Sequence, residues 1–154
     1  MKSIIITGSC GLVGQELSKF YLSKKFNVIG IDNNYRKFFF GEDGNNDWVK
    51  KDLVKIKNYT HFDLDIRNKF SLEKKIFKRV RNICGIIHCA AQPSHDWARS
   101  NPEMDFEINS MATLNLLLLA KKYSLKSPFI YFSTNKVYGD KINYENFIEK
   151  KKKI

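Results

Sequence analysis

Cysteine is scarce in this sequence and shows no pairing pattern. The three cysteines are Cys10, Cys84 and Cys89, and no two of them form a Cys-x-x-Cys pair. An odd number without that spacing argues against a disulfide framework and against a cysteine-ligated metal, so we expect no metal site. Small buried thiols in a reducing compartment are the better interpretation, and they indicate a cytoplasmic protein.

Long apolar runs are also missing. The most apolar window, residues 114–120, is much shorter than the roughly 20 apolar residues of a membrane span. Met1, Lys2 and Ser3 lead directly into an apolar run, and this pattern does not resemble a signal peptide. We therefore expect no membrane partner.

Acidic residues are few beside basic ones. Lys and Arg number 27 against 16 Asp and Glu, which gives a formal net charge of +11. The run 150–153 is all lysine, and the other lysines are scattered through helical stretches, as on a solvated surface. No interleaving of basic and aromatic residues supports a nucleic-acid partner, which we do not expect. A basic surface also suits a substrate with several phosphates, so charge alone does not decide the partner.

Short apolar runs alternate with helical stretches along the chain. With 154 residues, of which 43% are hydrophobic, the chain can form one domain with a core. The apolar runs predict strands at 3–7, 27–31, 60–62, 85–89 and 128–133. The helical spacing of apolar residues predicts helices at 12–24, 48–57, 69–81 and 101–123.

This alternation predicts an α/β fold of the Rossmann type. Right-handed crossovers give a doubly wound parallel sheet with the strand order 3-2-1-4-5, which stops after the fifth strand. The ligand crevice of such a sheet lies at the carboxyl ends of strands 1 and 4, where the order reverses. We expect this domain to span residues 1–140 and a short basic tail to span 141–154.

A glycine turn follows the first predicted strand. Gly8, Gly11 and Gly14 have the spacing G-x-x-G-x-x-G and open a helical stretch. A strand, a glycine turn and a helix in this order form a cradle for a diphosphate, because the helix N-terminus offers free N–H groups. The first glycine permits a tight turn, the second lets a diphosphate approach the backbone, and the third lets the helix pack on the strand.

A carboxylate ends the second predicted strand. Asp32 follows the apolar run 28–31, where dinucleotide-binding domains place an acid about 20 residues after the glycines to hold the adenosine ribose. An acid there also repels a 2′-phosphate, so the position favours NAD over NADP. The alternative is an ordinary glycine-rich turn with an Asp that caps a loop.

The stretch 33–46 is predicted to be a long loop. It contains three consecutive phenylalanines, 38–40, beside glycine, asparagine and aspartate residues. A loop of this length is usually functional or mobile. A small satellite cluster, in which the phenylalanines cover the sheet edge, is an equally good interpretation.

Five segments of the chain resemble motifs of one known family. They are, in order, 7–14 (TGSCGLVG), 32–34 (DNN), 63–67 (DLDIR), 88–91 (HCAA) and 133–139 (STNKVYG). In these motifs the sequence resembles the extended short-chain dehydrogenase/reductases, in their NAD-dependent epimerase/dehydratase group, which acts on nucleotide sugars. The resemblance implies a Rossmann domain, NAD as cofactor and an isomerase that oxidises its sugar transiently.

The resemblance also implies contacts with each part of the cofactor. The backbone N–H groups of Leu12 and Val13 would bind the diphosphate within the glycine turn. Asp32 and Asn33 would hold the adenosine ribose. Asp65 and Ile66 would lie against the adenine, with the carboxylate accepting from its exocyclic amine. A cap for the following helix is the alternative role of Asp65.

Further matching positions follow the fourth strand and lie near the chain end. Ala90 and Ala91 would be small because the cofactor passes over them, and Gln92 would lie beside it. Asn109 matches a helix asparagine of the family, although it could be a satisfied polar residue on a buried helix. Thr134 takes the catalytic Ser/Thr position, and its hydroxyl would bind the sugar oxygen that loses its proton. For His95, a solvated loop histidine is preferred over a substrate contact.

One element of the family is missing from the sequence. Its proton-transfer pair is a Tyr and a Lys four positions apart on the helix after the fifth strand, whereas only Tyr21 and Lys25 have this spacing here. Two functions therefore stay open. The chain is the cofactor-binding part of an NAD-dependent nucleotide-sugar epimerase, with a CDP-sugar favoured, or it is a non-catalytic or split-enzyme NAD-binding module.

The end of the chain leads to a further expectation. Without a sixth strand, the apolar fifth strand would be an open edge. We therefore expect a complementing chain or self-association, and a truncated or split gene product.

Overall fold

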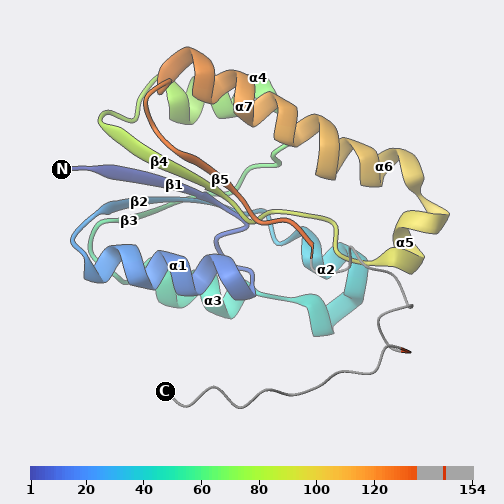
Figure 1. The fold of residues 1–154 in the computed structure, drawn as a ribbon. Helices are drawn as coiled ribbons and strands as arrows, with labels where there is room; N and C mark the ends of the chain where they lie inside the picture. The colour runs from blue at the N-terminus through green and yellow to red at the C-terminus, as the bar shows by residue number, and fades with distance from the viewer. Residues whose placement is uncertain (135–143, 145–154) are drawn as a thin grey trace.

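The fold is a parallel sheet covered on both faces. The computed structural model describes residues 1–134 and Tyr144. Its five strands have the order β3-β2-β1-β4-β5, and all neighbouring strands are parallel (Figure 1). The strands are β1 (Ser3–Thr7), β2 (Asn27–Ile31), β3 (Tyr59–Phe62), β4 (Ile83–His88) and β5 (Phe129–Tyr131). The predicted fold class and strand order are confirmed.

The strand bounds follow the apolar runs because the central strands are buried on both faces. All five residues of β1 are buried. β1 and β2 have the predicted bounds, whereas β4 begins two positions before the predicted residue 85 because Ile83 pairs with Ser3 across a register shift. β5 ends at Tyr131 instead of continuing to 133.

Helices cover the two faces of the sheet (Figure 1). One face carries α1 (Leu12–Ser23) and α3 (Asp47–Leu53), and the other carries α4 (Lys69–Leu72) and α7 (Ala112–Tyr123). Side chains alternate along a strand, so Ile4 and Ile6 pack in one hydrophobic cluster and Ile5 packs in the other. β1 therefore contributes to both halves of the core.

Two predicted helices contain π-helical turns. The helix expected at 69–81 consists of α4 followed by η2 (Glu73–Phe77). The helix expected at 101–123 consists of α6 (Pro102–Phe106), the π-helical η3 (Glu107–Met111) and α7. Apolar spacing predicts that these stretches are helical, but it does not reveal a single turn with i→i+5 bonds.

The expectation of a long loop at 33–46 is wrong. This stretch forms α2 (Tyr35–Phe40) and the 3-10 helix η1 (Gly41–Gly44). The apolar spacing of the sequence gives no indication of α5 (His95–Ser100), which begins where the Ser94 side chain accepts from the Trp97 N–H at 3.2 Å. Helices of six residues are too short for apolar periodicity to reveal, because tertiary contacts and caps stabilise them.

Apolar side chains are exposed on one edge of the sheet and on one helix. Among the residues that the structure describes, β5 pairs only with β4, and Ile130 is 45% exposed. Leu114, Leu117 and Leu118 of α7 are also exposed. The open apolar edge that the sequence analysis expected is therefore present within residues 1–134. No helix in the described part of the chain is long and apolar enough to span a membrane.

Candidate functional site

A cleft of about 250 Å³ lies where the strand order reverses, beside the residues that follow β1 and β4. Most of the predicted cofactor residues line it. They are Gly8, Gly11, Leu12, Val13, Gly14, Asp32, Asn33, Asp65, Ile66, Ala90 and Ala91. Gln92, Asn109 and Thr134 are not among the lining residues. The structure therefore brings together side chains from the ends of four different strands.

The three glycines of the turn have different environments. Gly8 has φ +65°, and a Cβ there would lie 2.7 Å from the Ala90 nitrogen. A Cβ at Gly14 would overlap the carbonyl oxygen of Gly8, so only glycine lets α1 pack this closely. At Gly11 the nearest atom to a Cβ would be the same oxygen at 3.3 Å, and this glycine lines the cleft. Gly8 and Gly14 thus shape the turn, and Gly11 leaves its surface open to a ligand.

The N-terminus of α1 is open at the cleft. Gly11 is the N-cap residue and provides no side-chain cap, and the first turn contains no acidic residue. Leu12 is 81% exposed, and both Leu12 and Val13 line the cleft. The first N–H groups of a helix have no partner within it, and they carry a partial positive charge. This turn fits the diphosphate of a dinucleotide.

Asp32 is fixed at the end of β2. One carboxylate oxygen accepts from the Cys10 N–H at 2.9 Å, and the other accepts from the Asn34 N–H at 2.8 Å. Burial and the Asp32 charge raise the pKa of the Cys10 thiol to about 12, so this cysteine stays protonated. Asp32 therefore caps the following loop and also presents its carboxylate at the wall of the cleft.

Sequence reasoning missed the contribution of α2 to the cleft. Tyr35, Arg36 and Phe39 all line it. Phe39 packs edge-on against Trp97 of α5, with ring centroids 4.7 Å apart, so the two short helices stabilise each other. The sequence signal for this contribution is the aromatic run 38–40 after Asp32, which is compatible with both a functional loop and a cluster at the sheet edge.

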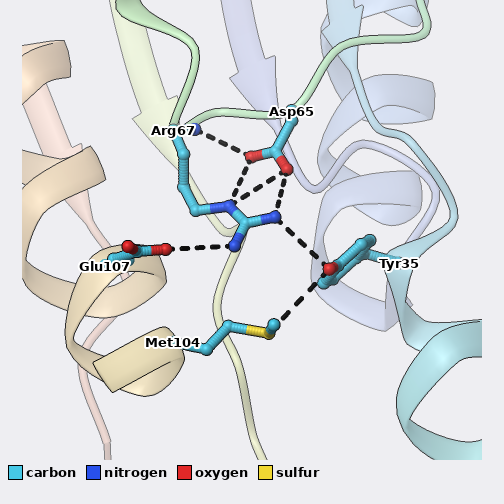
Figure 2. A network of polar contacts seen from close by, with 5 residues as sticks. All are labelled: Tyr35, Asp65, Arg67, Met104 and Glu107. Carbon is cyan, nitrogen blue, oxygen red and sulfur yellow. Dashed lines mark hydrogen bonds and ion pairs between the residues drawn. The ribbon is translucent and has the colours of Figure 1, made fainter. Parts of the chain in front are cut away.

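Asp65 and Arg67 form the centre of a polar network beside the cleft (Figure 2). Arg67 donates to both Asp65 oxygens, and the Nη2–Oδ2 distance is 2.6 Å. Burial alone would raise the pKa of the Asp65 carboxyl, but the hydrogen bonds from Arg67 outweigh it and hold that pKa below its usual range. Asn68, not Asp65, caps α4, because its side chain accepts from the Ser71 N–H. The helix-cap role of Asp65 is therefore wrong.

Gln92 and Asn109 bind each other behind the cleft. Gln92 is only 5% exposed, and its backbone N–H donates to Asn109 Oδ1 at 2.9 Å. Asn109 Nδ2 donates back to the Gln92 carbonyl at 3.2 Å and to Asp105 at 3.0 Å. Asn109 thus holds the segment after β4, as its alternative role implied, and a direct cofactor contact for either residue stays a prediction.

His88 links the sheet to the long helix. The Thr113 hydroxyl donates to the Asn109 carbonyl at 2.7 Å, so it accepts from His88 Nε2 at 2.9 Å. His88 Nδ1 then accepts from the Thr7 hydroxyl at 2.6 Å, which itself accepts from the Ala90 N–H at 3.3 Å. Burial lowers the pKa of His88 to about 4, so the ring is neutral at physiological pH.

Comparison with known proteins identifies the family. The model of the "NAD dependent epimerase/dehydratase family" matches residues 4–153, almost the whole chain.

The chain belongs to the NAD dependent epimerase/dehydratase family. It is 39% identical over 142 residues to CDP-paratose 2-epimerase of Salmonella typhi, covering 92% of this chain and 39% of that relative. The chain therefore spans about two-fifths of that relative's length.

Solved structures of the family share the fold. The UDP-Glc/GlcNAc 4-epimerase of Campylobacter jejuni superposes with a TM-score of 0.75 at 20% identity, covering 91% of this chain and 39% of that one. The UDP-glucose 4-epimerase of Thermus thermophilus, solved in complex with NAD, has a TM-score of 0.64 at 26% identity. That match covers 82% of this chain and 36% of the solved one. The expected cofactor of the family, NAD, is confirmed by these findings.

Thr134 is exposed and follows β5, and its role stays a prediction. Tyr138 of the motif 133–139 lies outside the described residues. Tyr21 packs against the hydrophobic cluster that contains Ile4 and Ile6, and neither Tyr21 nor Lys25 lines the cleft. These two residues therefore do not form a proton-transfer pair at the cleft.

No metal centre is found in residues 1–134 or at Tyr144: no group of three or more His, Cys, Asp and Glu side chains there is arranged to hold an ion. The three cysteines are free thiols, and burial raises the pKa of Cys89, which lines the cleft, to about 11.

Proposed function

We propose that this chain binds NAD in the cleft between the glycine turn and the end of β4. The observation that carries the proposal is the open N-terminus of α1 above Gly11, beside the fixed carboxylate of Asp32. The backbone N–H groups of Leu12 and Val13 bind the diphosphate, and Asp32 with Asn33 binds the adenosine ribose. Ala90 and Ala91 leave room for the dinucleotide over the sheet.

The cofactor is NAD and not NADP in this proposal. Both Asp32 oxygens already accept from backbone N–H groups, so the carboxylate is held in place at the cleft wall. A 2′-phosphate on the ribose would lie against this negative charge. Hydroxyl groups of an unphosphorylated ribose can instead donate to its remaining lone pairs.

The wider proposal is that the chain is the cofactor-binding part of a nucleotide-sugar epimerase, with a CDP-sugar as substrate. It is supported by the 39% identity to CDP-paratose 2-epimerase. It is also supported by the strings 90–97 (AAQPSHDW) and 133–140 (STNKVYGD), which resemble that subfamily. NAD, when bound, would supply reversible hydride transfer with the sugar. Thr134 would hydrogen-bond the sugar oxygen, and Gln92 would lie beside the cofactor.

A second candidate is a non-catalytic or split-enzyme NAD-binding module. It is favoured by one observation: among the described residues, β5 pairs only with β4 and leaves an apolar edge exposed. In this case the exposed β5 edge pairs with a second chain or with another copy. The three free thiols suit a cytoplasmic location for either candidate.

Calorimetric titration with NAD tests cofactor binding. We expect the wild-type chain to bind NAD and to bind NADP at least about tenfold more weakly, since a fixed like charge costs more than about 1.4 kcal/mol. Asp32→Ala should weaken NAD binding and remove the discrimination. Asp43→Ala removes an exposed carboxylate outside the cleft and should change neither. Unchanged NAD affinity in Asp32→Ala would refute the proposed orientation of the cofactor.

The enzymatic proposal needs a different test. The sequence immediately downstream in the gene should encode a segment with Tyr-x-x-x-Lys. Co-expression of that segment should give turnover of a CDP-sugar, and Thr134→Val should then reduce the turnover. NAD binding without turnover in the presence of the segment would favour the non-catalytic module.

A further inference from the structure

We propose that Arg67 is a positioning residue for adenine recognition, because it orients Asp65 to accept from the exocyclic amine of the base. This inference rests on the proposed binding of NAD. Asp65 lines the cleft, whereas Arg67 is not among the lining residues and contacts the Asp65 carboxylate (Figure 2). Arg67 therefore acts on the dinucleotide through Asp65 and not by direct contact.

The contacts between the two side chains leave a defined part of the carboxylate available. Asp65 Oδ1 accepts from the Arg67 backbone N–H at 2.8 Å and from Nε at 3.1 Å. Oδ2 accepts from Nη2 at 2.6 Å and from Nε at 3.1 Å. A carboxylate has about four lone-pair sites, and Nε shares its hydrogen between the two oxygens, so acceptor capacity remains for a ligand amine. The Asp65 side chain is 30% exposed and so accessible.

Arg67 is itself held from two further directions (Figure 2). Its Nη1 donates to Glu107 Oε2 of η3 at 3.2 Å, and its Nη2 donates to the Tyr35 hydroxyl at 3.3 Å. The guanidinium carbon also lies 5.1 Å from the centre of the Tyr35 ring. The Tyr35 hydroxyl donates to the Met104 sulfur at 3.8 Å. Arg67 is thus fixed by α2 and by η3, and its own position fixes the Asp65 carboxylate.

The chemistry of this arrangement selects a hydrogen-bond donor on the base. The fork of donors from Arg67 keeps the pKa of the Asp65 carboxyl low, so the group is ionised and acts only as an acceptor. Adenine has an amine at position 6, which can donate a hydrogen bond to this carboxylate. Hypoxanthine has an oxygen at that position, and two acceptors would face each other. Lys cannot replace Arg67 here, because an ammonium group does not donate as a planar fork.

The test measures the preference for NAD over nicotinamide hypoxanthine dinucleotide, in which an oxo group replaces the 6-amino group and N1 carries a hydrogen. Calorimetry on the wild-type chain should give a preference of at least about tenfold, the effect of one hydrogen bond to a charged group. Asp65→Asn should abolish or reverse the preference, because its amide can donate to the oxygen. Arg67→Lys and Arg67→Ala should each reduce the preference to within about threefold. Arg79→Ala removes an exposed arginine away from the cleft and should leave the preference unchanged.

The outcomes separate this inference from the proposed function. A wild-type chain that binds neither dinucleotide refutes both. If the chain binds NAD but Arg67→Lys and Arg67→Ala keep the full preference for NAD over the hypoxanthine dinucleotide, the inference alone is refuted. Tighter NAD binding in Arg67→Ala would also refute it, because it would mean that Arg67 competes with adenine for Asp65. If Arg67 had a purely structural role, its substitution would weaken the binding of both dinucleotides equally and leave the preference unchanged, which also refutes the inference. If Arg67→Ala does not fold, Arg67→Lys, which retains the charge and most of the aliphatic stem, decides the question.

Discussion

The three glycines of the turn show how differently one residue type can be required within a few positions. Gly8 needs a positive φ and close contact with Ala90, whereas Gly14 needs the absence of a Cβ against the Gly8 carbonyl. Gly11 has neither requirement, since its φ is −73° and only the Gly8 oxygen is near. A substitution at Gly14 should therefore mainly lower the stability of the fold, whereas a substitution at Gly11 should mainly weaken ligand binding.

Alanine substitutions test this separation. Gly14→Ala should lower the free energy of unfolding by about 1–3 kcal/mol or more, because the new Cβ overlaps backbone that cannot move independently. Gly11→Ala should change stability by less than about 1 kcal/mol but weaken NAD binding, because it adds a methyl group at a residue that lines the cleft. Urea unfolding and calorimetry measure the two effects. A Gly14→Ala protein as stable as wild type would contradict the observed helix packing.

The buried His88 should make stability depend on pH. The unfolded chain protonates this histidine near its ordinary pKa of 6.5, whereas the folded chain resists protonation until about pH 4. The unfolded state thus binds more protons, and stability falls as the pH decreases through this window. Between pH 7 and pH 5 the loss through His88 should be about 2 kcal/mol.

Urea unfolding at these two pH values checks the prediction. His88→Gln should be less stable than wild type at pH 7, because the bonds to Thr7 and Thr113 are disturbed, but its stability should change less with pH. His95→Gln, at an exposed position, should retain the wild-type pH dependence. An identical pH dependence in His88→Gln and wild type would show that His88 is not the titrating group.

At the scale of elements, the open side of β5 is the feature with the clearest consequence. Among residues 1–134 no strand pairs with its outer side, and Ile130 and Tyr131 of this strand are exposed. Such an edge favours strand pairing between molecules. We expect the wild-type chain to self-associate with increasing concentration. Ile130→Lys should shift it toward the monomer, as measured by analytical ultracentrifugation.

A matched variant distinguishes the edge from general charge effects. Leu125→Lys adds the same charge at a residue that is 75% exposed and lies outside β5, so it should associate like wild type. A wild-type chain that stays monomeric at high concentration would argue against an exposed pairing edge.

The elements also show where prediction from the sequence succeeds. The glycine turn, Asp32 and the strand order follow from local motifs and from the alternation of strands and helices. The contact of Arg67 with Glu107 joins residues 40 positions apart, and it depends on how η3 packs over the loop after β3. Local sequence patterns do not reveal contacts between residues so far apart in the chain. The helices α2 and α5 could not be predicted for the same reason, because the Phe39–Trp97 contact stabilises them.

At the scale of the whole molecule, cofactor binding should be visible as stability. A ligand that binds only the folded state at about 100 times its Kd adds about 2.7 kcal/mol, which corresponds to a rise in Tm of about 5–10 °C for a chain of this size. NAD should give this shift in a thermal melt. Nicotinamide mononucleotide lacks the adenosine half and should give a smaller shift at the same concentration. Equal shifts would place the adenosine contacts outside the cleft.

The central place of β1 bears on how the chain reaches this structure. Ser3 pairs with Asn27 on one side and with Ile83 on the other. During synthesis, β1 must therefore wait for more than half of the described chain to follow it before its second neighbour emerges. Such non-local pairing slows folding. Until the second neighbour arrives, it leaves the apolar side chains and the unpaired edge of β1 exposed. Chaperone dependence during synthesis is the expected biological cost of this topology.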